Sequence, residues 1–204
     1  MLTEIVLATT IEPGDDPLVA LATKLDVPYF RGSEFDVLGR YAGAVLAFDP
    51  DIVVRLTADC PLLDGSVVDR VVKEFQGTES IDYASNTLER SYPHGLDTEV
   101  ISREALIRAN LEATLLYDRE HVTPYLYRHP ELFSLLNVKH SSDLSQYRLT
   151  VDESPDLKLV TRIYEHFQDY NFSFMEVIDF LNEHPEITQI NKHLNQKPGN
   201  KSVK

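Results

Sequence analysis

The chain has 204 residues, 43% of them hydrophobic, which is enough for one large domain with a full apolar core. Its formal net charge of −14 argues against a nucleic-acid surface, which needs clustered Lys and Arg, but not against a nucleotide neutralised by a cation and a few arginines. The single cysteine excludes an internal disulfide, and the sequence has neither an apolar run of about 18 residues nor a signal peptide. We therefore expect a soluble cytoplasmic protein that does not span a membrane.

The first half of the chain alternates predicted strands and helices. Apolar, β-branched runs indicate buried strands, and apolar residues at helical spacing indicate amphipathic helices. The strands are expected at Glu4–Thr10, at Val27–Gly32, from Ile52 onward and at Asp82–Asn86, and the helices at Pro17–Leu25, Asp36–Phe48 and Gly65–Phe75. This alternation predicts an α/β fold with a mainly parallel, three-layer sheet.

The second half of the chain is less regular. A Pro/Gly loop leads into a short strand within Tyr92–Ser102, and Phe133–His140 and Gln146–Val151 are predicted to pair as a hairpin. Helices are expected at Arg103–Leu115, after a polar turn within Asp118–Tyr127, at Asp156–Gln168 and at Ser173–Leu181. We expect residues 1–191 to form one domain and the polar, Lys-rich tail, residues 192–204, to be disordered.

Two segments each follow an apolar strand pattern with an acidic residue. The run that starts at Ile52 breaks at Asp59 and Pro61, and the run from Tyr147 ends at Asp152. Ligands of open α/β sheets bind at the carboxyl ends of strands, and two carboxylates there can hold one hard cation such as Mg²⁺. The alternative is that both acids cap the helices that follow, as Asp often does. The residues alone leave both interpretations open.

Short polar motifs follow one another in a characteristic order along the chain. They are Arg31–Glu34 with Asp36–Leu38 and Arg40–Tyr41, Arg55–Asp64, Asp82–Asn86, Tyr92–Pro93 with Gly95–Asp97 and Glu99, Arg119–Tyr125, and Arg148–Asp152 with Asp156–Leu157. From about Ile5 to Asn191, their order and spacing resemble the spore-coat polysaccharide (SpsF-type) cytidylyltransferase family. That family is related to the sugar-acid cytidylyltransferases, which make CMP-linked sugars.

The resemblance implies a Rossmann-like nucleotide-sugar transferase fold and a nucleotidyl transfer reaction. A sugar hydroxyl attacks the α-phosphorus of CTP, giving a CMP-sugar and pyrophosphate. Asp59 and Asp152 match the positions that ligate Mg²⁺ and are the predicted catalytic and metal-binding residues. The family also implies a homodimer, with residues 92–150 near the acceptor pocket and the subunit contact.

Two further groups of residues are expected to bind the substrates. Those predicted to bind the nucleotide are Arg31, Ser33, Asp36, Arg40 and Ala58. Those predicted to bind the acceptor sugar are Asn86, Tyr92, Gly95, Asp97, Glu99, Arg119, His121 and Arg148. Carboxylates and amides suit sugar hydroxyls, and an arginine suits the carboxylate of an acidic sugar. The alternatives are surface ion pairs and residues that stabilise turns.

The sequence departs from the family at its start. Met1–Thr3 lead directly into a segment that matches the family's second strand, so the first β-loop-α unit, whose loop wraps the triphosphate, is expected to be missing. The missing strand normally lies inside the sheet, so its loss predicts a gap lined by unpaired backbone groups. Two rival functions stay open: a non-catalytic remnant or interaction subunit on the same scaffold, and a metal-dependent glycosyltransferase, although Thr57–Asp59 does not supply that class's Asp-x-Asp.

Overall fold

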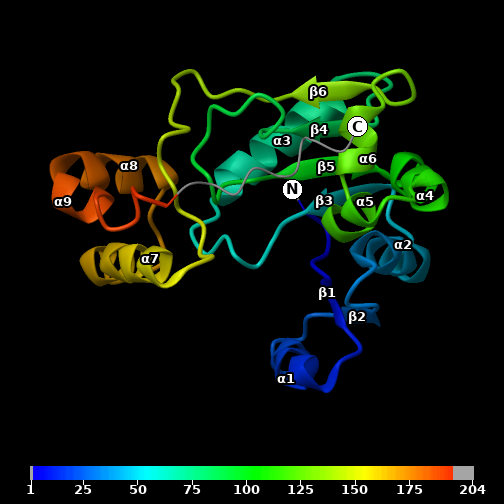
Figure 1. Cartoon of the computed structure of the whole chain (residues 1–204), viewed down its shortest axis with the longest axis horizontal. Coiled ribbons are helices and arrows are strands. Elements are labelled where there is room, and N and C mark those ends of the chain that lie inside the picture. Colours follow the sequence, from blue (N-terminus) through cyan, green and yellow to red (C-terminus); the bar gives the residue numbers. More distant parts are fainter. Residues whose placement is uncertain (1, 195–204) are drawn as a thin grey trace. The chain divides into compact units, whose positions relative to one another are not determined.

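The computed structural model describes residues 2–194, and within them the chain forms two compact units. Unit 1 consists of residues 2–55, 68–89 and 98–138, and unit 2 of residues 56–67, 90–97 and 139–194. Figure 1 labels the helices and strands of both. The α/β class is confirmed, whereas the prediction of one domain over residues 1–191 stays a prediction. Most of the predicted disordered tail, residues 195–204, lies outside the described residues.

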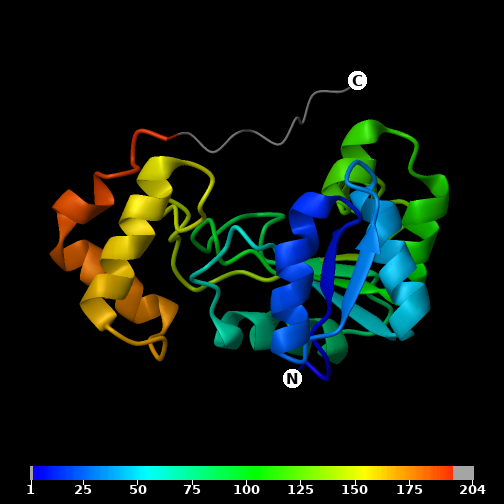
Figure 2. The ribbon, with the colours of Figure 1, turned by 90° about the horizontal axis from the view of Figure 1, so that it is seen from below.

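Unit 1 begins with a two-stranded parallel sheet. Strand β1 (Leu7–Thr10) pairs with β2 (Tyr29–Gly32), with Leu7 opposite Tyr29. The connection runs through η1 (Pro13–Asp15) and helix α1 (Asp16–Lys24), as parallel neighbours require a crossover. Figure 2 shows α1 and the two strands side by side. The predicted strand–helix–strand order of this segment is confirmed.

Unit 1 also contains a four-stranded sheet with the order β3-β5-β4-β6. Its strands are β3 (Ile52–Arg55), β4 (Tyr83–Ser85), β5 (Glu99–Ser102) and β6 (Leu135–Asn137). β4 and β6 pair in parallel, but β5 runs antiparallel to both β3 and β4. Three of the four strands therefore share one direction, and the expected mainly parallel pairing is wrong at β5. The connection from β4 to β5 contains no helix, so β5 enters the sheet without the crossover that a parallel neighbour needs.

Helices cover the four-stranded sheet and form the core of unit 1. They are α2 (Val37–Phe48), α4 (Arg103–Glu112), α5 (Leu116–His121) and α6 (Pro124–Arg128). The core joins them to the sheet through Leu38, Val45, Tyr83, Ile101, Leu106 and Leu126, all nearly inaccessible. Helix α3 (Gly65–Gly77) begins in unit 2 and ends in unit 1.

The two sheets of unit 1 are separate. Among the strands described, β1 is paired with β2, and β3 with β5, so each of β1 and β3 has one edge without a strand. The residues of β3 are only half-buried although three of the four are apolar, whereas those of β4 are buried.

Two local predictions were wrong. Segments 133–140 and 146–151 do not form a hairpin: β6 pairs in parallel with β4, and Arg148 makes an isolated bridge with His94. Both segments have found backbone partners distant in sequence, which a local pattern does not reveal. The polar turn expected before Thr123 is helix α5, whose capping residue Val122 has a positive φ of 72°.

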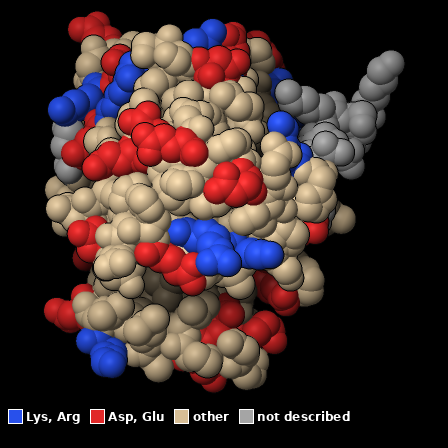
Figure 3. Space-filling model, turned by 90° about the vertical axis from the view of Figure 1, so that its left-hand side faces the viewer, with Lys and Arg blue, Asp and Glu red and all other residues tan. Residues whose placement is uncertain are grey.

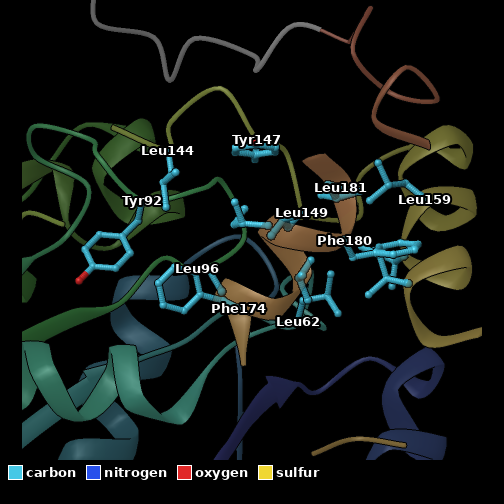
Figure 4. Close-up of a cluster of buried hydrophobic side chains, with 14 of the residues drawn as sticks. Leu62, Tyr92, Leu96, Leu144, Tyr147, Leu149, Leu159, Phe174, Phe180 and Leu181 are labelled. Atoms are coloured by element: carbon cyan, nitrogen blue, oxygen red, sulfur yellow. The ribbon is translucent and has the colours of Figure 1, made fainter. Parts of the chain in front are cut away.

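Unit 2 combines loops with three helices, α7 (Ser154–Phe167), α8 (Phe174–Glu183) and α9 (Pro185–Thr188). Their common core includes Leu62, Tyr92, Leu96, Leu149, Phe174 and Leu181, which are labelled in the close-up of Figure 4. The core therefore ties the loops of residues 56–67, 90–97 and 139–152 to the helices. Across residues 2–194, no helix is long and apolar enough to cross a membrane.

Candidate functional site

The two predicted metal-binding carboxylates follow segments that are hydrogen-bonded to each other in unit 2. The backbone N–H of Val151 donates to the carbonyl oxygen of Asp59 at 2.8 Å. The Thr150 hydroxyl donates to the same carbonyl at 3.1 Å and to Oδ2 of Asp59 at 3.3 Å. Asp152 is the next residue, and both acidic residues are exposed. The fold therefore brings Asp59 to the segment that carries Asp152, although they are 93 positions apart.

The backbone here differs from the strand ends that the sequence predicts. β3 ends at Arg55, and Asp59 lies in a turn beyond it. The segment that precedes Asp152 forms no strand, and its single sheet-like contact is the bridge between Arg148 and His94. Both acids therefore sit on loops that are fixed by hydrogen bonds, and neither is the last residue of a strand.

Gly95 allows the loop of residues 93–97 to approach the segment before Asp152. His94 exchanges backbone hydrogen bonds with this segment, donating to Tyr147 at 3.0 Å and accepting from Leu149 at 2.7 Å. Gly95 has a φ of 102°, and a Cβ there would lie 2.6 Å from Leu149 C and Thr150 N. No other residue type tolerates both conditions. The structure thus gives Gly95 a backbone role, while its predicted contact with the acceptor stays a prediction.

Arg148 contacts Asp152 directly. Its Nη2 donates to Oδ2 of Asp152 at 2.6 Å, and its Nε and Nη2 each donate to the buried carboxylate of Asp156 at 2.9 Å. The hydrogen bonds to Asp156 and then to Asp152 raise the pKa of Arg148, which is therefore charged. Arg148 was predicted to bind the carboxylate of an acidic sugar, and in the structure two carboxylates of its own chain accept from it.

The donor set at Asp59 and Asp152 fits a magnesium ion. Mg²⁺ prefers oxygen ligands and is usually held by one or two carboxylates together with waters and substrate phosphates. Two exposed carboxylates on adjoining backbone segments meet that need. Among residues 2–194, no group of three or more His, Cys, Asp or Glu side chains could hold a metal, so a closed all-protein cage is not formed there.

Cys60 lies beside Asp59 but does not have the properties of a nucleophile. Burial raises the pKa of its thiol to about 12, and the Thr57 hydroxyl, 3.4 Å away, offsets this in part. A thiol with such a pKa is protonated at neutral pH and unreactive. Cys60 is buried beside the acidic turn and therefore has a packing role.

In unit 1, the predicted nucleotide-binding residues contact one another and neighbouring backbone. Arg31 donates to the carbonyls of Thr10 and Glu12 at 2.7 and 2.9 Å and to Asp16 at 2.8 Å. It thereby fixes the loop that follows β1. Arg40 donates to the Ser33 carbonyl at 2.8 Å. Ala58, the fifth predicted nucleotide residue, is exposed in the turn of unit 2 next to Asp59.

Asp36 and Arg119 form one cluster although they were assigned to different substrates. Nε and Nη2 of Arg119 donate to the two oxygens of Asp36 at 2.8 and 2.6 Å, and the Gly39 amide donates to Asp36 at 2.9 Å. Burial alone would raise the pKa of Asp36, but these hydrogen bonds outweigh it and lower the pKa. Asp36 is thus the N-cap of α2, and Arg119 holds it there.

Glu99 is placed in a buried ion pair. It accepts hydrogen bonds from Arg55, its register partner on β3, and from the Tyr83 hydroxyl at 2.6 Å. Burial and then the charge of Glu99 raise the pKa of Tyr83 well above its usual value. Glu99 is 7% accessible, so this burial leaves a sugar hydroxyl little access to its carboxylate.

The other predicted acceptor residues are spread over both units. In unit 1, Asn86 is buried and accepts from the Thr98 amide at 2.9 Å, and His121 is exposed with its ring against Tyr117. In unit 2, the Tyr92 ring is 1% accessible and belongs to the core. Asp97 accepts both hydrogen bonds of a bidentate pair from Arg90, at 2.6 and 2.8 Å.

Sequence reasoning missed four residues that organise these clusters, namely Arg55, Arg90, Asp156 and Asn191. The sequence did offer a signal for Asp156. It lies three residues after Glu153, the N-cap residue of α7, and an acidic side chain at that position commonly accepts a hydrogen bond from the backbone amide of the N-cap residue. Its partner Asn191 is 35 positions away and gave none. Long-range partners of this kind become visible only in the folded chain.

Comparison with known proteins shows the family. The model of the cytidylyltransferase family matches residues 1–196. The chain is 38% identical over 198 residues to the uncharacterized protein MJ1063 of Methanocaldococcus jannaschii, covering 96% of this chain and 80% of that protein. It is 31% identical over 187 residues to the spore coat polysaccharide biosynthesis protein SpsF of Bacillus subtilis, covering 89% of this chain and 76% of SpsF.

A solved structure agrees with these relatives. A cytidylyltransferase from Leptospira borgpetersenii superposes with a TM-score of 0.87 at 32% identity, covering 94% of this chain and 80% of that one. The fold and the family model together define a nucleotidyltransferase. The chain belongs to the SpsF-type cytidylyltransferase family, whose reaction is the transfer of CMP from CTP.

Proposed function

We propose that this chain binds CTP with Mg²⁺ at Asp59 and Asp152 and transfers CMP to a hydroxyl of a sugar or sugar acid. The product feeds the biosynthesis of a cell-surface polysaccharide. Family membership supports the nucleotide, and the name of the Bacillus relative, a spore coat polysaccharide biosynthesis protein, supports the sugar and the pathway. CTP, Mg²⁺ and a sugar are therefore the small-molecule partners of the proposed reaction.

The hydrogen bond from the Val151 amide to the Asp59 carbonyl carries this proposal. It joins the acidic turn to the segment that ends in Asp152, so both carboxylates are presented from a fixed backbone. When bound, the cation would neutralise charge on the triphosphate and orient the α-phosphate for in-line attack. The acceptor hydroxyl oxygen forms a bond to the α-phosphorus and loses its proton to water. The bond from that phosphorus to the bridging oxygen breaks, and pyrophosphate leaves with that electron pair.

The surrounding residues hold the two carboxylates in place. Thr150 donates to Asp59, and Arg148 donates to Asp152, so each acid has a polar neighbour that restricts its rotamers. The proposed contacts of Ser33, Ala58 and His121 with substrates rest on their family positions.

A non-catalytic subunit is the second candidate function, and one observation favours it. The four arginines predicted to meet a substrate all donate hydrogen bonds to groups of the chain itself; they are Arg31, Arg40, Arg119 and Arg148. A triphosphate site usually directs several cationic or backbone donors at the phosphates. If these arginines keep their present partners, the scaffold could persist as a binding or regulatory subunit.

Calorimetric titration with CTP at fixed MgCl₂ tests the proposed function. We expect metal-dependent CTP binding by the wild-type chain and an affinity loss of at least about tenfold in Asp59→Ala and in Asp152→Ala. Asp179→Ala removes an exposed carboxylate from α8 of the same unit and is the matched control, expected to bind like wild type. A folded wild-type chain that does not bind CTP would overturn the proposal and favour the subunit.

A further inference from the structure

A single buried carboxylate collects five hydrogen bonds just below the exposed acid of the candidate site. Oδ1 of Asp156 accepts from Arg148 Nε at 2.9 Å and from Asn191 Nδ2 at 2.8 Å. Oδ2 accepts from Arg148 Nη2 at 2.9 Å and from the backbone amides of Asp152 and Glu153 at 3.1 and 3.0 Å. Asp156 is 0% accessible, so solvent cannot replace these donors.

The hydrogen bonds of Asp156 hold Asp152 in two ways. The first is through the backbone, because Oδ2 fixes the amides of Asp152 and Glu153 at the start of α7. The second is through the side chain, because Asp156 orients the guanidinium of Arg148, whose Nη2 then donates to Asp152 at 2.6 Å. An arginine held in a bidentate pair has a fixed plane and a fixed direction for its remaining donors.

Asn191 closes the network from the far end of the described chain. Its Nδ2 donates to Asp156 at 2.8 Å and to the backbone carbonyl of Arg148 at 3.0 Å. Asn191 is 3% accessible, and the Arg148 side chain 11%. The polar groups beneath Asp152 are thus paired and shielded from water, whereas the Asp152 side chain is 42% accessible.

The hydrogen bonds of Asp156 favour its ionised form. Burial alone would raise the pKa of this carboxyl, but the hydrogen bonds from Arg148, Asn191 and the two amides outweigh it and lower the pKa to about 2.

We propose that Asp156 is the positioning residue for the candidate metal site, acting on Asp152 through Arg148 and through the backbone at the start of α7. The inference rests on the proposed function, because it takes Asp152 as a metal ligand. It also assigns Arg148 to the support of Asp152, in place of a direct contact with the acceptor's carboxylate. Outer partners of metal ligands commonly change metal affinity by about 10–100-fold when they are altered.

Titration of Mn²⁺ by electron paramagnetic resonance at fixed CTP tests this role. Asp156→Asn keeps the shape of the side chain but replaces one acceptor with a donor that faces other donors. We expect its Mn²⁺ affinity to fall by about tenfold or more, and its CTP affinity to return to the wild-type value at saturating Mn²⁺. A purely structural defect would instead lower CTP affinity at every Mn²⁺ concentration.

Ile163→Val is the matched control, because it removes one buried methylene from the same helix without touching the carboxylate network. We expect wild-type Mn²⁺ affinity from this variant. If Asp156→Asn does not fold, as judged by circular dichroism, Asn191→Ala removes one donor of the same carboxylate, and a smaller loss of Mn²⁺ affinity is then the expected result.

The outcomes separate this inference from the proposed function. Wild-type Mn²⁺ affinity in a folded Asp156→Asn, or in Asn191→Ala where it alone folds, would overturn the positioning role while leaving the metal site in place. A wild-type chain without metal-dependent CTP binding would instead overturn the proposed function. Loss of Mn²⁺ affinity equal to that of Asp152→Ala would support a strict dependence of Asp152 on Asp156.

Discussion

Two predicted site carboxylates of unit 1 differ from two of unit 2 in how the protein uses them. In unit 1, Asp36 caps a helix and Glu99 lies in a buried ion pair. In unit 2, Asp59 and Asp152 are exposed, and the buried hydrogen bonds belong to residues behind them. A polar residue that is satisfied inside the protein contributes mainly to stability, whereas one that is exposed on a fixed backbone is available to a ligand.

The distribution of charged side chains on the surface does not show which carboxylates are structural and which are available to a ligand. Figure 3 shows one face, on which acidic side chains gather in several patches and basic ones form separate groups among them. With a formal net charge of −14, exposed carboxylates are common on this protein, so exposure alone does not identify a binding site. What distinguishes Asp152 is the buried hydrogen-bond network beneath it, which fixes its backbone and its side chain.

The largest effect is expected from Glu99→Ala in unit 1. Removing this acid leaves the guanidinium of Arg55 buried without its ion-pair partner, and such a loss typically lowers the free energy of unfolding by about 3–5 kcal/mol. Urea unfolding measures it. The double variant Arg55→Met, Glu99→Leu should recover most of the stability, because apolar residues of similar size replace the whole pair. If Glu99→Ala were as stable as wild type but had lost affinity for the acceptor sugar, Glu99 would be a residue of the acceptor site and its structural role would be contradicted.

Gly95→Ala should have the next largest effect and should affect both stability and binding. The added Cβ would lie 2.6 Å from the backbone of Leu149 and Thr150, at a φ that other residues rarely adopt. Strain of this kind costs roughly 1–3 kcal/mol, and we expect the free energy of unfolding to fall by about that amount. Since the displaced segment leads to Asp152, metal-dependent CTP affinity should fall too.

Thermal unfolding followed by calorimetric titration checks both effects of Gly95→Ala. Gly14→Ala is the control, because a Cβ at Gly14 would meet no atom within 4 Å. Unchanged stability in Gly95→Ala would contradict the close approach of the two segments.

The smallest effect is expected from Asp36→Ala in unit 1. Loss of an N-cap residue usually lowers the free energy of unfolding by about 0.5–2 kcal/mol, here including the pair with Arg119. Because we interpret Asp36 as a helix cap, CTP affinity should stay within about twofold of wild type at a temperature where the variant is folded. A larger loss of CTP affinity in a folded variant would place Asp36 in the nucleotide site.

Local patterns of the sequence determined much of this protein. The alternation of strands and helices up to Ser85, the α/β class and a helix that starts near Asp36 were all predicted, because hydrophobic periodicity depends on neighbours a few positions apart. The short motifs also identified the family, which the comparisons confirmed. Asp59 and Asp152 were predicted to share one metal site by resemblance to the family, and the structure links their backbone segments by a hydrogen bond.

The tertiary structure alone decided which polar residues are left for a ligand. No sequence pattern near Glu99 predicts its ion pair with Arg55, 44 positions away, and none near Asp156 predicts its hydrogen bond with Asn191. The reversal of β5 and the bridge between His94 and Arg148 likewise depend on partners distant in the chain. Residue type and spacing are local, whereas burial and hydrogen-bond satisfaction are properties of the packed chain, and these two separate a structural carboxylate from one that can bind a metal ion.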